Sequence, residues 1–226
     1  VEAGPAPAQR ACERREEAEH CAPVASRGAE PLHGNPAEHL MPGPRRIEAL
    51  RERYPEGFAR LATLARDDGD RVRALVTLAS LVEAETGHPD DRPHVASVFW
   101  NRLTRPDFRP RLLQSDPTVT YGCLAGPRAG LAVTCADADG GAAPITAAML
   151  ADDRNPWNTY RHEGLPPTPV CNPGGAALAA VLAPRASDDL YFVARGDGRS
   201  VFAGTLEGHR RNVRAHLRPR PEGAAP

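Results

Sequence analysis

An apolar stretch that ends in two acidic residues constrains the fold more than any other part of the sequence. Residues 74–84 are almost wholly apolar, with Ser80 and Glu83 among the few polar members, and Glu85 follows directly. At helical spacing each acid lies on an apolar stripe, and the two are about 200° apart around the axis. A helix that is apolar nearly all round is a buried helix. We therefore expect a buried helix over about residues 71–86 that carries at least one carboxyl into the interior or to the wall of a cleft.

This pair of acids allows a functional and a structural interpretation. A carboxyl in apolar surroundings resists ionisation and can donate a proton near neutral pH. Alternatively, the acids lie at a helix end where they reach water or pair with one of the many arginines. The stretch alone favours the structural interpretation.

Composition excludes several classes of function. The chain has 226 residues, enough for one sizeable domain or a domain with an appendage, and a net charge of −1. That charge gives no reason to expect a nucleic-acid partner or an anionic membrane surface. The sequence contains no lysine, which excludes Schiff-base chemistry and a P-loop lysine. It contains no run of 18 apolar residues, so we predict no transmembrane helix.

The five cysteines suggest one candidate disulfide and no metal site. No Cys or His spacing matches a zinc site, and we expect neither a metal nor a cofactor. Cys123 and Cys135 bracket a loop rich in Gly, Ala and Pro. This spacing suits a disulfide in an oxidising compartment. Unpaired thiols are an equally acceptable interpretation.

The order of local signals predicts an α+β fold: a helix-rich catalytic domain, a small antiparallel β-hairpin and a C-terminal helix. Residues 1–44 are interpreted as a disordered or linker-like arm, residues 45–218 as the folded domain and residues 219–226 as a disordered tail. The hairpin is expected over 189–194 and 200–203, around a Gly-Asp-Gly turn. We also expect two short helices broken at Pro55, and a loop over 67–70 with a helix N-cap at its end. A further helix is expected to begin at Pro93, and Asp116 is expected to be the N-cap of the next. Asn172 and Pro173 are expected at the start of a helix over 176–183.

Seven blocks in a fixed order resemble the YceG-like family, the family of the MltG-type endolytic murein transglycosylases. They span roughly residues 70–217, about two-thirds of the chain, and include a Val-Glu-x-Glu-Thr motif at 82–86. The blocks are 78–87, 95–103, 113–122, 158–160, 164–174, 190–194 and 209–213. Full-length members usually carry an N-terminal membrane anchor and a LysM-like subdomain, and neither is recognisable in residues 1–69. We therefore expect membrane contact only through an anchor that is not present in this chain.

The resemblance implies cleavage of the MurNAc-β-1,4-GlcNAc bond in peptidoglycan glycan strands, which leaves a 1,6-anhydroMurNAc end. It also implies that Glu83 is the single general acid/base. Such a reaction needs one carboxylic acid that is protonated at the outset, and the position of Glu83 on an apolar stripe is consistent with that demand. The implied location is the cell envelope, periplasmic or on the outer face of the inner membrane, where cell-wall synthesis enzymes are possible partners.

The remaining candidate site residues are assigned to substrate binding or support. They are Glu85, Gln114, Asp116, Tyr121, Asn158, Tyr160 and Asn172. Gln114 suits sugar hydroxyls because an amide both donates and accepts hydrogen bonds, and Tyr160 is a candidate to stack on a sugar or to orient Glu83. Five of these residues have a structural alternative: Glu85 bonded to backbone or an arginine, Asp116 or Asn172 as a helix cap, and Asn158 and Tyr160 in an ordered loop. The alternative functions are a non-catalytic module that binds glycan or a cell-wall synthesis partner, and a different carboxylate-dependent hydrolase.

Overall fold

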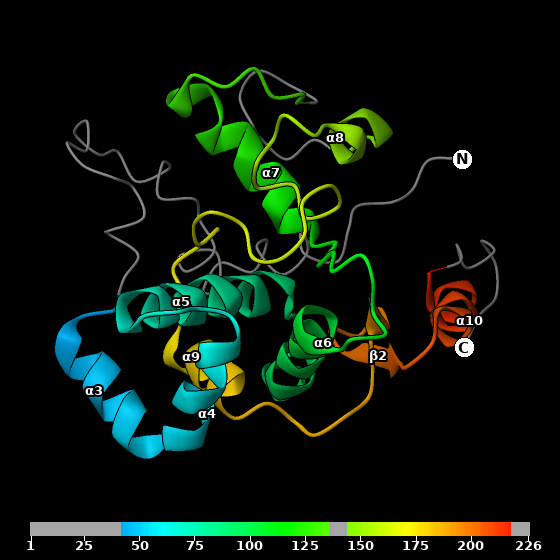
Figure 1. The fold of residues 1–226 in the computed structure, drawn as a ribbon. Helices are drawn as coiled ribbons and strands as arrows, with labels where there is room; N and C mark the ends of the chain where they lie inside the picture. The colour runs from blue at the N-terminus through cyan, green and yellow to red at the C-terminus, as the bar shows by residue number, and fades with distance from the viewer. Residues whose placement is uncertain (1–41, 136–143, 218–226) are drawn as a thin grey trace.

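The computed structural model describes residues 42–135 and 144–217 (Figure 1). The arm over residues 1–41, the tail over 218–226, Cys12 and Cys21 lie outside the described residues. In chain order the elements are α3 (Pro44–Arg53), α4 (Pro55–Arg60), η3 (Leu61–Thr63), α5 (Asp68–Glu85), η4 (Pro89–Asp91), α6 (Arg92–Thr104), α7 (Asp116–Ala125), η5 (Pro127–Ala129), α8 (Ala147–Ala151), α9 (Gly175–Leu182), β1 (Tyr191–Ala194), β2 (Ser200–Ala203) and α10 (Leu206–His216).

Helix α5 forms the centre of the core, as its apolar sequence predicts. Every residue from Ala74 to Val82 is buried. The helix packs against α6 and α9, which also pack against each other, and Figure 1 shows it crossing the middle of the molecule between α7 and α9. The large side chains between these helices, such as Leu78, Phe99 and Leu178, are almost fully inaccessible to solvent. Their burial is the main stabilising term of the fold.

Helix α5 begins earlier than the sequence analysis predicts. Asp67 is the N-cap, and its side chain accepts a hydrogen bond from the backbone N–H of Asp70. The prediction of a loop over 67–70 with a cap at its end is therefore wrong. The chain offers several aspartates in this run, and the first of them satisfies the free N–H groups of the first turn.

Two other N-cap predictions are also wrong. Ser115, not Asp116, is the N-cap of α7, and Asp116 is the first helical residue. Gly174 is the N-cap of α9, whereas Asn172 is exposed and lies outside the helix. The break at Pro55 between α3 and α4 is confirmed. Gly57 lets α4 approach α9 closely, because a Cβ there would lie 2.2 Å from the carbonyl oxygen of Leu182.

The β-hairpin and the last helix confirm the α+β prediction. Strands β1 and β2 are antiparallel, with Phe192 opposite Phe202, and α10 packs on both strands (Figure 1). His94 of α6 stacks on Phe202 with ring centroids 3.5 Å apart, and it hydrogen-bonds Asp189 just before β1. The hairpin is thereby fixed to the helical core beside the start of α6.

A disulfide joins Cys123 to Cys135, so the first of the two interpretations of these cysteines is confirmed. It ties the loop after η5 to α7. Cys171 is free and buried. No helix within residues 42–135 and 144–217 is both long and apolar enough to cross a membrane.

Candidate active site

A proline-rich segment, residues 165–174, lies along α5 and ends at Glu83. The backbone N–H of Val170 donates to the Ser80 hydroxyl at 3.0 Å, and the Cys171 thiol donates to the Ser80 carbonyl. Further along, the backbone N–H of Gly174 donates to Oε2 of Glu83 at 3.2 Å. Because prolines restrict the backbone, this segment forms a conformationally restricted wall beside the helix.

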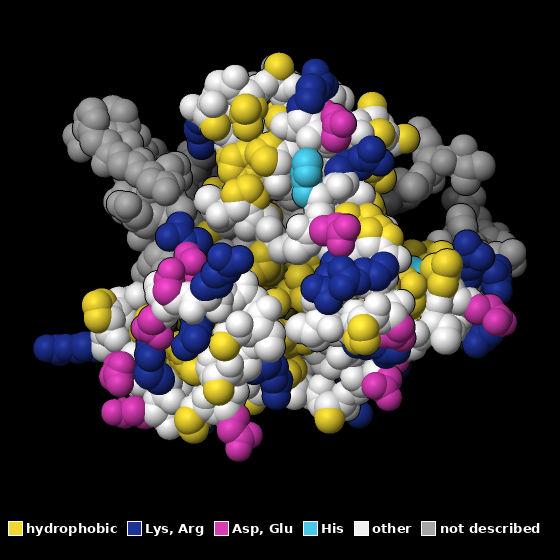
Figure 2. Space-filling view, viewed as in Figure 1, with side chains coloured by type: hydrophobic (Ala, Val, Ile, Leu, Met, Phe, Trp, Pro, Cys, Tyr) yellow, Lys and Arg dark blue, Asp and Glu magenta, His cyan; other side chains and the backbone are white. Residues whose placement is uncertain are grey.

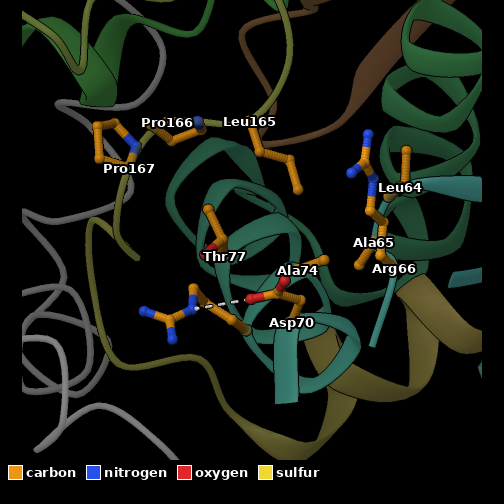
Figure 3. Close-up of a pocket in the computed structure, with 10 residues that line it drawn as sticks. Leu64, Ala65, Arg66, Asp70, Ala74, Thr77, Leu165, Pro166 and Pro167 are labelled. Carbon is orange, nitrogen blue, oxygen red and sulfur yellow. Dashed lines mark ion pairs between the residues drawn. The ribbon is translucent and has the colours of Figure 1, made fainter. Parts of the chain in front are cut away.

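The other end of this wall borders a pocket of about 350 Å³. Figure 3 shows Pro166 and Pro167 above Thr77, with Asp70 below and Arg66 on the opposite side from Pro167. The lining is mixed: apolar side chains from the proline segment face a surface that carries two arginines and one aspartate. The lining residues are Leu64, Ala65, Arg66, Asp70, Arg73, Ala74, Thr77, Leu165, Pro166 and Pro167. Pocket and Glu83 therefore lie along the same helix and the same wall.

Glu83 is held by two donors near the surface. Its Oε1 accepts a hydrogen bond from Nη2 of Arg92 at 3.2 Å, and the exposed fractions of the two side chains are 11% and 13%. Its Oε2 faces the N-terminus of α9 through Gly174, an end that attracts negative charge. Both donors stabilise the carboxylate form. The arginine partner foreseen by the structural interpretation is thus Arg92.

Glu85 lies in a different environment, packed against the start of α7. Its Oε1 accepts a hydrogen bond from the Ser115 hydroxyl at 2.8 Å. Burial and, to a smaller extent, the nearby Asp116 carboxyl raise the pKa of Glu85 to about 8, although the Ser115 hydroxyl and the Arg102 guanidinium act in the opposite direction. The sequence predicts that at least one acid resists ionisation, and this acid is Glu85.

Asp116 and Tyr160 extend the Glu85 cluster. The Tyr160 hydroxyl donates to Oδ1 of Asp116 at 2.5 Å and not to Glu83. Burial raises the pKa of Asp116, while the bond from Tyr160 lowers it. Burial and the Asp116 carboxyl both raise the pKa of the Tyr160 phenol. Tyr160 therefore supports the neighbourhood of Glu85 rather than orienting Glu83.

The other predicted site residues differ in how free they are to meet a ligand. Gln114 is exposed and has a φ of 52°, a left-handed conformation that is strained for a residue other than glycine. Asn158 is fully buried, and its Nδ2 donates to the carbonyls of residues 149, 150 and 152. Tyr121 packs edge-on against Trp157 at 5.7 Å between centroids. Asn172 is exposed. Gln114 is thus available to a ligand, whereas Asn158 organises its loop.

Three residues of the site were missed by the sequence analysis. They are Arg92, which pairs with Glu83; Ser115, which bonds Glu85; and Arg102, which is 6% exposed and donates to the carbonyls of Leu113 and Leu190. Ser115 directly precedes Asp116, which the sequence predicts as a helix cap. Nothing local distinguishes the two arginines from the other basic residues, which are all arginines too.

The face drawn in Figure 2 shows apolar side chains between the part that holds α7 and α8 and the layer that holds α5. Arginine side chains flank these apolar side chains on both sides. Acidic side chains adjoin the arginines on both sides, so this apolar area is bordered by charges of both signs.

Comparison with known proteins adds an independent line of evidence. A sequence model of the YceG-like family matches residues 42–215. The chain belongs to the YceG-like family. This confirms the resemblance drawn from the seven sequence blocks.

Two relatives of this YceG-like chain are named endolytic murein transglycosylases. The protein from Bacillus subtilis (strain 168) is 35% identical over 151 residues, which cover 67% of this chain and 36% of that protein. The protein from Streptococcus pneumoniae serotype 2 (strain D39) is 35% identical over 147 residues, which cover 65% of this chain and 24% of that protein. The chain thus spans about a third to a quarter of the length of these relatives. A crystal structure of a YceG-like protein from Listeria monocytogenes is 27% identical, with a TM-score of 0.49 over 79% of this chain and 67% of that one.

Proposed function

We propose that this chain is the catalytic domain of an endolytic lytic transglycosylase. Its substrate is the peptidoglycan glycan strand, and the bond cleaved is the β-1,4 linkage between N-acetylmuramic acid and N-acetylglucosamine. The observation that carries the proposal is the position of Glu83, a nearly buried carboxyl between Arg92 and the N-terminus of α9, in a chain similar to proteins named endolytic murein transglycosylases.

Glu83 acts in this proposal as both acid and base. Its protonated carboxyl donates to the glycosidic oxygen as the bond from that oxygen to the anomeric carbon breaks. The resulting carboxylate accepts the proton of the muramyl C6 hydroxyl, whose oxygen bonds to the anomeric carbon. The product carries a 1,6-anhydro ring, no water is consumed, and no second carboxyl is required, in contrast to the carboxylate pair of ordinary glycosidases.

In this proposal, substrate binding changes the surroundings of Glu83. In the free chain, Arg92 and the Gly174 N–H stabilise the carboxylate. A glycan strand lying over the side chain removes the remaining water, and this desolvation disfavours the charged form. The two donors then become most valuable in the transition state, when the negative charge returns to Glu83.

The neighbouring residues are proposed to hold the strand and its surroundings in place. Gln114 donates and accepts hydrogen bonds with sugar hydroxyls, because it is exposed and its amide has both donors and an acceptor. Asp116, Tyr160 and Asn158 support the loop that carries it. Tyr121 and Asn172 complete the candidate contacts. The proposed place of action is the cell envelope, where peptidoglycan lies.

Incubation of the purified chain with peptidoglycan, followed by separation and mass measurement of the products, tests this proposal. The wild-type chain is expected to release fragments with anhydromuramyl ends. Glu83→Gln is expected to lose activity by roughly 10²–10⁴-fold, the usual contribution of a general acid. Glu85→Gln is the matched control: an amide mimics a neutral carboxyl, so its activity at pH 7 should stay within about 10-fold of wild type.

Other outcomes identify the competing functions. An inactive Glu85→Gln beside an active Glu83→Gln assigns the acid to Glu85. Glycan binding without any product, at every pH tested, indicates a non-catalytic binding module. Products with reducing muramyl ends indicate a hydrolase that uses water.

A further inference from the structure

Arg92 contacts the proposed catalytic residue Glu83, and the catalytic proposal does not define what Arg92 contributes. Arg92 is the first residue of α6, nine positions after Glu83, and its guanidinium folds back across the turn to reach Oε1 of Glu83. Both side chains are almost nine-tenths buried. An ion pair removed from water to this degree is costly unless its geometry is fixed by the surroundings.

The turn between α5 and α6 is built so that this geometry is fixed. The Asp91 carboxylate accepts a hydrogen bond from the backbone N–H of Ser200 at 2.7 Å. Gly87 packs so closely against the hairpin that a Cβ there would lie 2.9 Å from the carbonyl oxygen of Gly198. The hairpin therefore holds Gly87, which precedes η4, and Asp91, the last residue of η4. Arg92 follows directly and has little freedom to move away from Glu83.

The charge of Arg92 is directed at Glu83 alone among the described carboxylates. Asp90 pairs with His88 and Arg199, and Asp91 is used by Ser200. In the described part of the chain, Arg92 forms an ion pair with Glu83 alone. Its Nε is buried there without a hydrogen-bond partner.

We propose that Arg92 is the positioning residue of this site, which fixes the Glu83 carboxyl against the end of the 165–174 wall and stabilises the negative charge that Glu83 gains on giving up its proton. This inference rests on the proposed role of Glu83. Arg92 does not touch the reacting bond. It acts through Glu83, together with the Gly174 N–H on the other carboxyl oxygen, so that both oxygens are held during proton transfer.

Substitution of Arg92 tests the inference through the rate and its pH dependence. Arg92→Gln is expected to lower kcat on the order of 10²-fold with little change in KM, as for loss of one donor to a developing charge. Removal of the cation also favours the protonated carboxyl, so the falling alkaline limb of the pH–rate profile should move to higher pH. A purely structural role would lower the amount of folded protein without moving that limb.

Arg92→Lys separates charge from geometry. Lysine keeps the positive charge but presents a compact ammonium on a flexible stem instead of a planar fork. The alkaline limb should return toward its wild-type pH, while kcat stays several-fold below wild type. Arg211→Gln is the matched control, because Arg211 is exposed on α10 and its one ion pair within the described residues is with Glu207; its kinetics should equal those of wild type. Thermal unfolding of each variant reports whether it is folded.

The outcomes distinguish this inference from the proposed function. A folded Arg92→Gln with wild-type kcat and an unmoved alkaline limb overturns the inference, and an inactive Glu83→Gln in the same assay leaves the proposed function intact. If Arg92→Gln does not fold, a folded Arg92→Lys with wild-type kcat at every pH overturns it instead. A fully active Glu83→Gln removes the proposed acid and the role of Arg92 with it.

Discussion

Glu83 and Glu85 stand two residues apart on α5, yet they lie in opposite chemical surroundings. Glu83 faces an arginine and a backbone N–H at the end of the proline wall. Glu85 faces a hydroxyl and a second carboxyl at the start of α7. The angle of about 200° between them on the helix sends one toward α6 and α9 and the other toward α7. One carboxyl therefore has two hydrogen-bond donors, whereas burial and a neighbouring carboxyl raise the pKa of the other.

This difference shows that burial alone does not select a proton donor. By its raised pKa Glu85 is the better neutral acid, but its hydrogen bonds tie it to the packing of α7. Glu83 has two donors, Arg92 and the Gly174 N–H, and in the proposed reaction they stabilise the charge that forms after proton transfer. Catalysis depends on the change in stabilisation between ground and transition state, which is why we assign the reaction to Glu83 and support to Glu85.

The largest expected effect that sharpens this comparison is on stability at alkaline pH. The folded-state pKa of Glu85, about 8, lies above its ordinary value of 4.5, so the folded chain binds an extra proton between these pH values. Its contribution to stability is full below about pH 4.5 and is lost as pH rises through 8. Glu85→Gln should remove this loss and be on the order of 4 kcal/mol more stable than wild type at pH 9, relative to their difference at pH 4.5. Urea unfolding across this pH range measures it.

In the same experiment, Glu83→Gln serves as the counterpart. It loses the bonds that Arg92 and Gly174 make to a carboxylate, so it should be less stable than wild type at neutral pH. If Glu83→Gln, and not Glu85→Gln, removes the alkaline loss of stability, the assignment of the neutral carboxyl to Glu85 is wrong.

A smaller effect is expected when each acid is shortened by one methylene. Glu83→Asp withdraws the carboxyl from the bond it must protonate, and a displacement of about 1 Å can cost on the order of 10²-fold in rate. Glu85→Asp changes packing next to Ser115 but leaves the reacting group in place, so kcat should fall by less than about 10-fold. Rates of anhydromuramyl product release from peptidoglycan measure both. Equal losses in the two variants would mean that the two carboxyls share one function.

The buried helix and the hairpin could be predicted because their signals are local. Residues 74–84 are apolar on all sides, which only a buried helix satisfies, and the Gly-Asp-Gly turn at 196–198 favours a hairpin. Cap positions were harder, because Asp67, Asp68 and Asp70 are all acceptable caps by type. At α7 the choice also involves Tyr160, which bonds Asp116 from 44 positions away. Such a contact has no trace in the local sequence.

The candidate site was predictable as a pair of acids but not as two environments. Periodicity places both carboxyls on apolar stripes without showing which stripe meets α7 and which meets α9. The partner of Glu83 depends on how the 87–92 turn is clamped by Ser200, more than a hundred residues later. A sequence in which every basic residue is arginine gives no reason to single out Arg92 or Arg102. These choices are made by tertiary packing.

The smallest expected effect tests the hydrogen bond that distinguishes the Glu85 site most directly. Ser115 is 1% exposed, and its hydroxyl makes no capping bond to α7 but donates to Glu85. Ser115→Ala therefore removes that donor while the backbone bond from Ser115 N to Thr159 remains possible. The bond stabilises the charged carboxyl most, so the pKa of Glu85 should rise further, and the loss of about 1 kcal/mol should be greater at pH 9 than at pH 6. Urea unfolding at both pH values measures this difference. Thr63→Ala is the matched control, because the exposed Thr63 hydroxyl in η3 donates to the carbonyl of Arg60. A loss that is equal at the two pH values would show that Ser115 contributes packing and no charge stabilisation, and that the neutrality of Glu85 is set by burial and Asp116 alone.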